Sequence, residues 1–295
     1  MTFTIVLICL IAERFMLDAL AWRNDRWFFR YTLWYQAQSL PNGLQRGSLG
    51  LVTLLLPPLL AVALVQQILD GALWGFLDVA FALAVLLAAL GPEDLDQQIN
   101  RYVDAREQDD DEAATEVARH LIEDEPPTSE PARSQAVAES ALQLANRRIF
   151  AVLFWFILLG PLGAALYRLA SWLPRSDQSA QSIDYRLNAL QLVYILDWLP
   201  ARVTAFCYAV AGSFEDALYG WRSFQEQRYK EFSDANSGIL VCTGSGAMRL
   251  STLLDETQSG AQVYAYLPKA AMALIWRSLI VFMAMLAFAS LSGLV

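Results

Sequence analysis

The chain has 295 residues, of which 56% are hydrophobic and only 17% are charged, and its formal net charge is −9. This balance is too apolar for an ordinary soluble domain and is typical of apolar spans joined by polar connections. We therefore expect an all-α, polytopic transmembrane helical bundle with five to six membrane helices. An acidic surface also argues against nucleic acid as a partner.

The first apolar stretch, residues 2–20, is open to three interpretations. Its apolar beginning is followed by Glu13, Arg14 and Asp18, so the segment could span with a polar face turned inward, re-enter the membrane or lie in the interface. No small-residue cleavage site follows it, and we expect it to remain in the mature protein. Spans need roughly 20 apolar residues. Five further stretches qualify: about 48–69, 72–91, 149–172, 189–212 and 271–293.

Aromatic and basic residues alternate directly after the first stretch. They are Trp22, Arg23, Arg26, Trp27, Arg30, Tyr31, Trp34 and Tyr35. Tryptophan and tyrosine concentrate where a membrane meets water. We expect these residues to anchor a helix at headgroup level; a binding surface is the alternative.

Residues 92–148 hold 15 acidic and 6 basic residues, so this segment carries a net charge equal to that of the whole chain. Apolar residues recur there at helical spacing, which predicts three helices, the second ending at the proline-rich stretch 123–131. The acidic run 109–112 lacks the alternating ligand spacing of a calcium loop. We expect it to begin a helix, where the macrodipole favours carboxylates.

Two of the spans are interrupted. The stretch from Ala145 to Leu169 contains a Gly-Pro-x-Gly-Ala break, and the stretch YILDWLPAR places Asp197, Pro200 and Arg202 within six residues. Ionisable residues at membrane depth are costly and usually mark a functional or internally paired site. We therefore expect an interior polar site in which an acid such as Asp197 neutralises Arg202. Purely structural pairing is the competing interpretation.

Lysine and arginine predict the orientation. If five spans alternate, segments 13–47, 92–148 and 213–270 share one face and hold 16 of the 21 basic residues, whereas the opposite face around 168–188 holds three. Basic residues accumulate on the cytoplasmic side. We thus predict large cytoplasmic loops and a periplasmic 173–188 connection in the bacterial inner membrane.

Several kinds of chemistry have no support in the sequence. The three cysteines, Cys9, Cys207 and Cys242, lack the spacing of a disulfide framework or zinc site. His120 is the only histidine, which excludes a histidine metal cluster, and no Ser-His-Asp arrangement is suggested. The glycine-containing stretch 243–250 lacks the Lys-Ser/Thr ending of a phosphate loop. We predict no metal and no cofactor.

The ordered combination of motifs resembles a known group of membrane proteins. It runs from Glu13-Arg14, through ANRRIFAVLFWFILLGPLGAALYRL, YILDWLPARVTAFCYAVAG and DANSGILVCTGSGAMRL, to Arg277-Ser278. These features are similar to the CobD/CbiB superfamily, most closely its AmpE branch. The resemblance implies one membrane domain over 1–295, with 92–148 as an acidic cytoplasmic helical insert.

The two branches of this superfamily imply different activities. Its synthases form an amide between an aminopropanol unit and a corrinoid carboxyl, using ATP and magnesium. AmpE proteins are instead associated with β-lactamase induction. The acids of the synthase pattern are absent from every aligned position. Those positions hold Gln143, Leu144, Arg147, Ser171, Trp172, Pro174, Val193 and Tyr194.

We therefore expect a regulatory modulator of the β-lactam and cell-wall stress response that lacks the synthase activity. Its partners would be the lipid bilayer and a small anionic, cell-wall-derived or amphiphilic ligand; no protein partner is indicated. The candidate ligand site comprises Glu13, Arg168, Asp197, Arg202 and Asn236. One alternative is an amide-forming ligase of the CobD/CbiB type acting on an amphiphilic carboxylate, with a site rebuilt from acids such as Glu13, Asp18 and Asp197. Another is a transporter that uses the broken spans.

Overall fold

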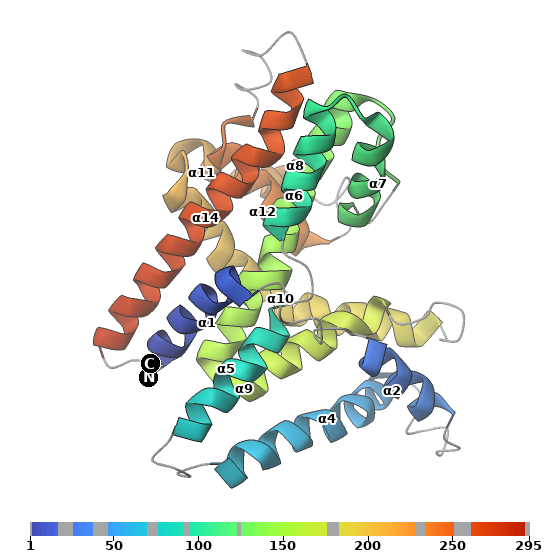
Figure 1. Cartoon of the computed structure of the whole chain (residues 1–295), viewed down its shortest axis with the longest axis vertical. Coiled ribbons are helices and arrows are strands. Elements are labelled where there is room, and N and C mark those ends of the chain that lie inside the picture. Colours follow the sequence, from blue (N-terminus) through green and yellow to red (C-terminus); the bar gives the residue numbers. More distant parts are fainter. Residues whose placement is uncertain are drawn as a thin grey trace. The chain divides into compact units, whose positions relative to one another are not determined.

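The computed structural model describes residues 2–16, 26–37, 47–69, 76–90, 95–122, 125–175, 183–227, 234–250 and 261–292. Within these ranges every regular element is a helix and no strand occurs, which confirms the predicted all-α class (Figure 1). The helices are α1 (Thr2–Met16), α2 (Arg26–Gln36), α4 (Gly47–Leu69), α5 (Phe76–Ala89), α6 (Leu95–Glu107), α7 (Asp111–Leu121), α8 (Glu130–Ala145), η3 (Asn146–Phe150), α9 (Ala151–Trp172), η4 (Leu173–Arg175), α10 (Ile183–Ala211), α11 (Phe214–Gln227), α12 (Ala235–Ala247) and α14 (Ala261–Leu291).

Four helical stretches in the described part of the chain are long and apolar enough to cross a membrane. They are Leu49–Leu69, Glu130–Trp172, Tyr185–Ala211 and Tyr266–Leu291. The apolar helices in the two other expected stretches are shorter, Phe3–Ala12 and Phe76–Ala89. The chain is therefore a helical membrane protein.

The chain divides into two compact units. Unit 1 comprises residues 1–92, 151–197 and 292–295, and unit 2 comprises residues 93–150 and 198–291. The core of unit 1 joins the aromatic helix α2 to α4, to the end of α9 and to the start of α10. Its buried members are Phe28, Leu51, Leu54, Leu55, Leu169, Trp172, Leu173, Tyr185 and Ala189.

Polar contacts fix α2 on α4 within unit 1. The hydroxyl of Tyr31 donates to the carbonyl of Leu54 at 2.9 Å, and the hydroxyls of Tyr35 and Thr53 lie 2.5 Å apart. Trp27 and Trp34 remain about half exposed, as interfacial anchors would be. The preceding residues Trp22 and Arg23 lie outside the described residues.

The position of α2 corrects part of the predicted orientation. The rings of Trp27 and Trp172 pack edge to face with centroids 6.2 Å apart, so α2 lies beside the end of α9. Segments in contact cannot lie on opposite faces of a hydrocarbon core about 30 Å thick. The expectation that 13–47 and 168–188 face opposite sides is therefore wrong for α2.

The predicted break in the central span is present in α9. Gly160 has φ 65° and ψ −151°, a backbone region open almost only to glycine. A Cβ atom added to Gly163 would lie 2.1 Å from the carbonyl oxygen of Trp155, whereas residues eight apart in a straight helix are separated by about 12 Å. The helix is thus sharply bent. The orientation predicted from basic residues treated α9 as one straight crossing of the membrane. This is why it placed α2 on the face opposite to the end of α9.

Unit 2 contains the three helices predicted for the acidic segment, α6, α7 and α8, together with α11, α12 and α14. The ring of Phe150 packs edge to face against Tyr208 and Phe282, at centroid distances of 6.2 and 5.8 Å. Glycines bring α11 and α12 into backbone contact. A Cβ at Gly220 would meet the carbonyl of Cys242 at 2.2 Å, and one at Gly246 would meet that of Asp216 at 2.3 Å.

The acidic run begins α7, as predicted. The Asp110 side chain caps this helix by accepting a hydrogen bond from the amide of Ala113 at 2.9 Å. Asp111 has a further role, because its carboxylate accepts hydrogen bonds from the buried guanidinium groups of Arg106 and Arg133. Arg106 also binds Glu130. The three helices of the segment are therefore held together by buried cations and more exposed acids.

Candidate functional site

The five predicted site residues fall in both units. Arg168 and Asp197 belong to unit 1, and Arg202 and Asn236 belong to unit 2. Glu13 lies in α1 of unit 1, but its side chain is outside the described part of the chain. Two polar groupings can therefore be described, one in each unit, and a single site formed by all five residues stays a prediction.

Asp197 is the buried carboxylate of unit 1. It is 5% exposed and accepts a hydrogen bond of 2.6 Å from the hydroxyl of Tyr167, which is fully buried. Tyr167 follows the break in α9 and Asp197 lies on α10, so the bond joins two apolar helices. A buried carboxylate requires such donors.

A second bond between α9 and α10 depends on Pro200. Because proline has no N–H group, the carbonyl of Leu196, four residues earlier, lacks its usual helical donor. The indole Nε1 of Trp155 donates to this oxygen at 3.1 Å. A polar side chain therefore satisfies the freed carbonyl, as structures within a membrane require. Trp155 and Tyr167 lie on either side of Gly160, so both halves of the bent helix are bonded to α10.

Arg168 lies one residue after Tyr167 and is 8% exposed. Its guanidinium carbon is 5.1 Å from the ring centroid of Trp172, one helical turn further along α9. This distance is within the range of a cation–π contact. The end of α9, where Trp172 packs against the aromatic helix α2, thus contains a buried cation.

Arg202 belongs to the polar grouping of unit 2. Its guanidinium lies 4.1 Å from the ring centroid of Trp198, donates to the Trp198 carbonyl at 2.5 Å and donates to the amide oxygen of Asn236 at 3.3 Å. Asn236 is 3% exposed in the first turn of α12. The structure therefore brings these two predicted site residues together.

A second arginine reaches the same turn of α12. Arg147 lies in the π-helix η3, and its guanidinium is 3.7 Å from the carboxylate of Asp234, which caps α12 by accepting from the amide of Ser237. Arginines from η3 and α10 thus converge on the start of one helix. Arg147 was not among the predicted site residues, although the Arg147-Arg148 pair leads into a span in one of the motifs of the family resemblance.

The π-helix itself is held by polar contacts inside unit 2. Thr204 donates to the amide oxygen of Asn146 at 2.9 Å, and both side chains are buried. Arg148 donates to Gln98 at 2.9 Å. Single π-helical turns often occur at functional sites. Here the turn carries both arginines of the pair into contact with other helices.

Three of the positions that would carry synthase acids have packing roles or bond within their own helix. Leu144 is buried in α8, Ser171 bonds to the carbonyl of Arg168 in its own helix, and Trp172 is in the core of unit 1. Among the described residues, no three His, Cys, Asp or Glu side chains are grouped as metal ligands would be.

Comparison with known proteins places these features in a family. The chain is 30% identical over 199 residues to a protein from Chromobacterium violaceum named cobalamin biosynthesis protein CobD, covering 65% of this chain and 62% of that protein. It is 30% identical over 211 residues to the protein of the same name from Stutzerimonas stutzeri, covering 70% of this chain and 64% of that one. The matches thus span less than two thirds of these relatives.

No solved structure matches the chain. The family model described as "Regulatory signalling modulator protein AmpE" matches residues 1–293, which includes both polar groupings, the break at Gly160 and the acidic helices. A match over almost the whole length identifies the family more firmly than the partial matches to the CobD proteins. The chain belongs to the AmpE family.

Proposed function

We propose that the protein is an inner-membrane modulator of the β-lactam and cell-wall stress response, acting on β-lactamase induction without the synthase chemistry of its superfamily. The observation that carries the proposal is the identity of the side chains at the positions that hold acids in the synthase pattern. Arg147 occupies one of them and contacts Asp234, and Trp172 occupies another and packs in a hydrophobic core. These side chains cannot replace carboxylates as magnesium ligands.

A regulatory protein needs a group whose contacts change when a signal binds. Arg202 suits this role because two of its acceptors, the carbonyl of Trp198 and the amide oxygen of Asn236, are neutral. A carboxylate or phosphate accepts a stronger, charge-assisted hydrogen bond from a guanidinium. A small anionic cell-wall fragment that binds Arg202 would therefore compete with Asn236 and alter the contact between α10 and α12.

The response phenotype tests the regulatory proposal. In a strain that lacks this protein, we expect β-lactamase induction by a β-lactam to change, and expression of the full chain to restore the original induction. Protein abundance in the membrane fraction should be measured in parallel. Unchanged induction in the strain without the protein would contradict the proposal.

The alternative is an amide-forming ligase acting on an amphiphilic carboxylate, and the two similar CobD proteins are the observation that favours it. A cell without the cobinamide-forming enzyme separates the two proposals. We expect no growth rescue by this chain, even with an added corrinoid precursor. Rescue that depends on the precursor would refute the regulatory proposal and establish synthase activity.

A further inference from the structure

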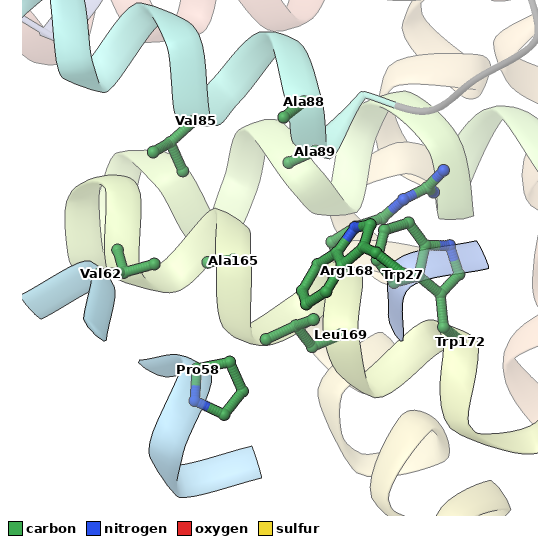
Figure 2. A pocket seen from close by; sticks show the side chains of 10 residues that line it. All are labelled: Trp27, Pro58, Val62, Val85, Ala88, Ala89, Ala165, Arg168, Leu169 and Trp172. Atoms are coloured by element: carbon green, nitrogen blue, oxygen red, sulfur yellow. The ribbon is translucent and has the colours of Figure 1, made fainter. Parts of the chain in front are cut away.

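Unit 1 has an open cavity of about 290 Å³ between α2, α4, α5 and α9. Figure 2 shows its lining, with Val62 and Val85 at one end and Arg168, Trp27 and Trp172 at the other. Apart from Arg168 and the two indole rings, every residue of the lining is aliphatic or proline. The remaining members are Pro58, Ala88, Ala89, Ala165 and Leu169. The cavity is therefore an apolar space with one cation at its aromatic end.

The walls of the cavity come from helices that are apolar enough for a membrane. α4 and α9 belong to candidate spans, and α5 is one of the shorter apolar helices. Pro58 and Val62 of α4 line the cavity, whereas Leu56, Leu60 and Leu64 of the same helix are about half exposed. Residues four apart share a helix face, so α4 has one face toward the cavity and another suited to lipid.

The aromatic end has the composition of a membrane interface. Trp27 is 51% exposed, and its ring packs against Trp172, on which the Arg168 guanidinium lies. Tryptophans are enriched at headgroup level, and basic pockets between membrane helices bind anionic lipid headgroups. The cation is therefore at the end of the cavity where a headgroup would lie.

We propose that this cavity binds one acyl chain of an anionic phospholipid from the surrounding membrane, with the lipid phosphate bound by Arg168. Ligand pockets for drug-sized molecules have volumes of about 300–1,000 Å³, so the cavity suits a single chain rather than a whole lipid. A soluble cell-wall fragment fits poorly, because its many polar groups would be buried against aliphatic walls without hydrogen bonds. This lipid site does not depend on the proposed regulatory function.

Lipid retention by the purified full-length protein tests the site. Native mass spectrometry would compare phosphatidylglycerol with phosphatidylcholine of the same acyl chains. We expect Arg168→Gln to lower phosphatidylglycerol retention by about tenfold or more, since a hydrogen bond to a charged group contributes roughly 1.5–3 kcal/mol. Arg168→Lys should retain part of the preference for the anionic lipid.

Filling the cavity tests the acyl chain separately. Ala165→Phe should reduce retention of both lipids, and Ala165→Leu provides a smaller change if the first variant fails to fold. The matched controls are Leu158→Phe on the exposed face of α9 and Arg186→Gln at the exposed start of α10. Both should bind lipid as the unaltered protein does.

Three outcomes would overturn the proposal. One is equal retention of the two lipids by the unaltered protein. Another is retention that neither Arg168→Gln nor the Ala165 variants change relative to their controls. The third is full competition by inorganic phosphate alone, which would indicate a site for a free anion. None of these readouts involves β-lactamase induction, so failure of the lipid site and failure of the regulatory proposal are distinguishable.

Discussion

The hydroxyl of Tyr167 donates a hydrogen bond of 2.6 Å to the carboxylate of Asp197, and both side chains are buried between α9 and α10. Ionisable side chains inside a membrane are costly unless partners stabilise them. The bond thus gives Asp197 a structural function that does not require a ligand. It also makes the contribution of Tyr167 measurable.

Replacing Tyr167 with phenylalanine should destabilise the protein. The change removes one donor from a buried acceptor, which typically costs about 1–3 kcal/mol, and leaves the aromatic ring in place. Thermal unfolding in detergent would measure the loss. Tyr219→Phe, at a residue that is 76% exposed, is the control and should have little effect. Equal stability of the two variants would show that the Tyr167 bond contributes nothing net.

The bend in α9 should depend on Gly160. No atom lies within 4 Å of a Cβ built at this position, so an alanine there would meet backbone strain rather than a steric clash. We expect Gly160→Ala to destabilise the protein by on the order of 1–3 kcal/mol. The control is Leu158→Ala on the exposed face of the same helix. Unfolding temperatures that match this control would contradict the bent conformation.

Cysteine labelling can test the corrected orientation. In a background without the three native cysteines, we expect Ala37→Cys and Arg186→Cys to be labelled from the same side of the membrane, because α2 packs beside the end of α9 and the start of α10. Glu112→Cys, in the acidic segment, should be labelled from the cytoplasm. Labelling of Ala37→Cys and Arg186→Cys from opposite sides would contradict this correction and support the original prediction that segments 13–47 and 168–188 face opposite sides of the membrane.

The sequence was sufficient to predict features that depend on neighbouring residues. Hydrophobic spacing predicted the helices of the acidic segment, and the Gly160-Pro161 pair predicted the break in α9. Contacts between segments far apart in the chain could not be predicted from the sequence. Nothing near Asp197 indicates that its donor is Tyr167, thirty residues earlier, because that pairing depends on the bend. The same bend made the count of crossings unreliable, and with it the position assigned to α2.

Acid should weaken the start of α11. The hydroxyl of Ser213 and the guanidinium of Arg249 both donate to Asp216, and these contacts lower its pKa from the ordinary value of 3.8. Since the pKa is lower in the folded protein than in the unfolded chain, ionised Asp216 stabilises the fold above pH 3.8, and this contribution is lost as the pH falls through the folded-state pKa.

Comparison with Asp216→Asn isolates this effect. The unfolding temperature of the unaltered protein should exceed that of the variant at pH 6, and the difference should shrink toward pH 3. Glu215→Gln, at the exposed neighbouring residue, is the control for removing one acid from the same helical turn. A difference that stays constant with pH would mean that Asp216 acts through packing rather than through its charge.

Arg202 provides the sharpest test of ligand binding. If its guanidinium serves an anionic ligand, Arg202→Ala should lower β-lactamase induction several-fold more than it lowers protein abundance. Arg277→Ala is a matched control, because Arg277 is also an arginine of an apolar helix that donates to the carbonyl four residues earlier, that of Ala273. It should change induction only in proportion to abundance.

The predicted neutralisation of Arg202 by Asp197 is tested with Asp197→Asn and the double variant, using quantitative blots and induction assays. If Arg202 binds ligand, the double variant should remain defective, because removing the acid cannot replace the lost guanidinium. If the two residues form only a structural pair, removing both should relieve the penalty of leaving one charge buried alone, which reaches several kcal/mol. Full induction in the double variant would therefore eliminate the ligand role of Arg202.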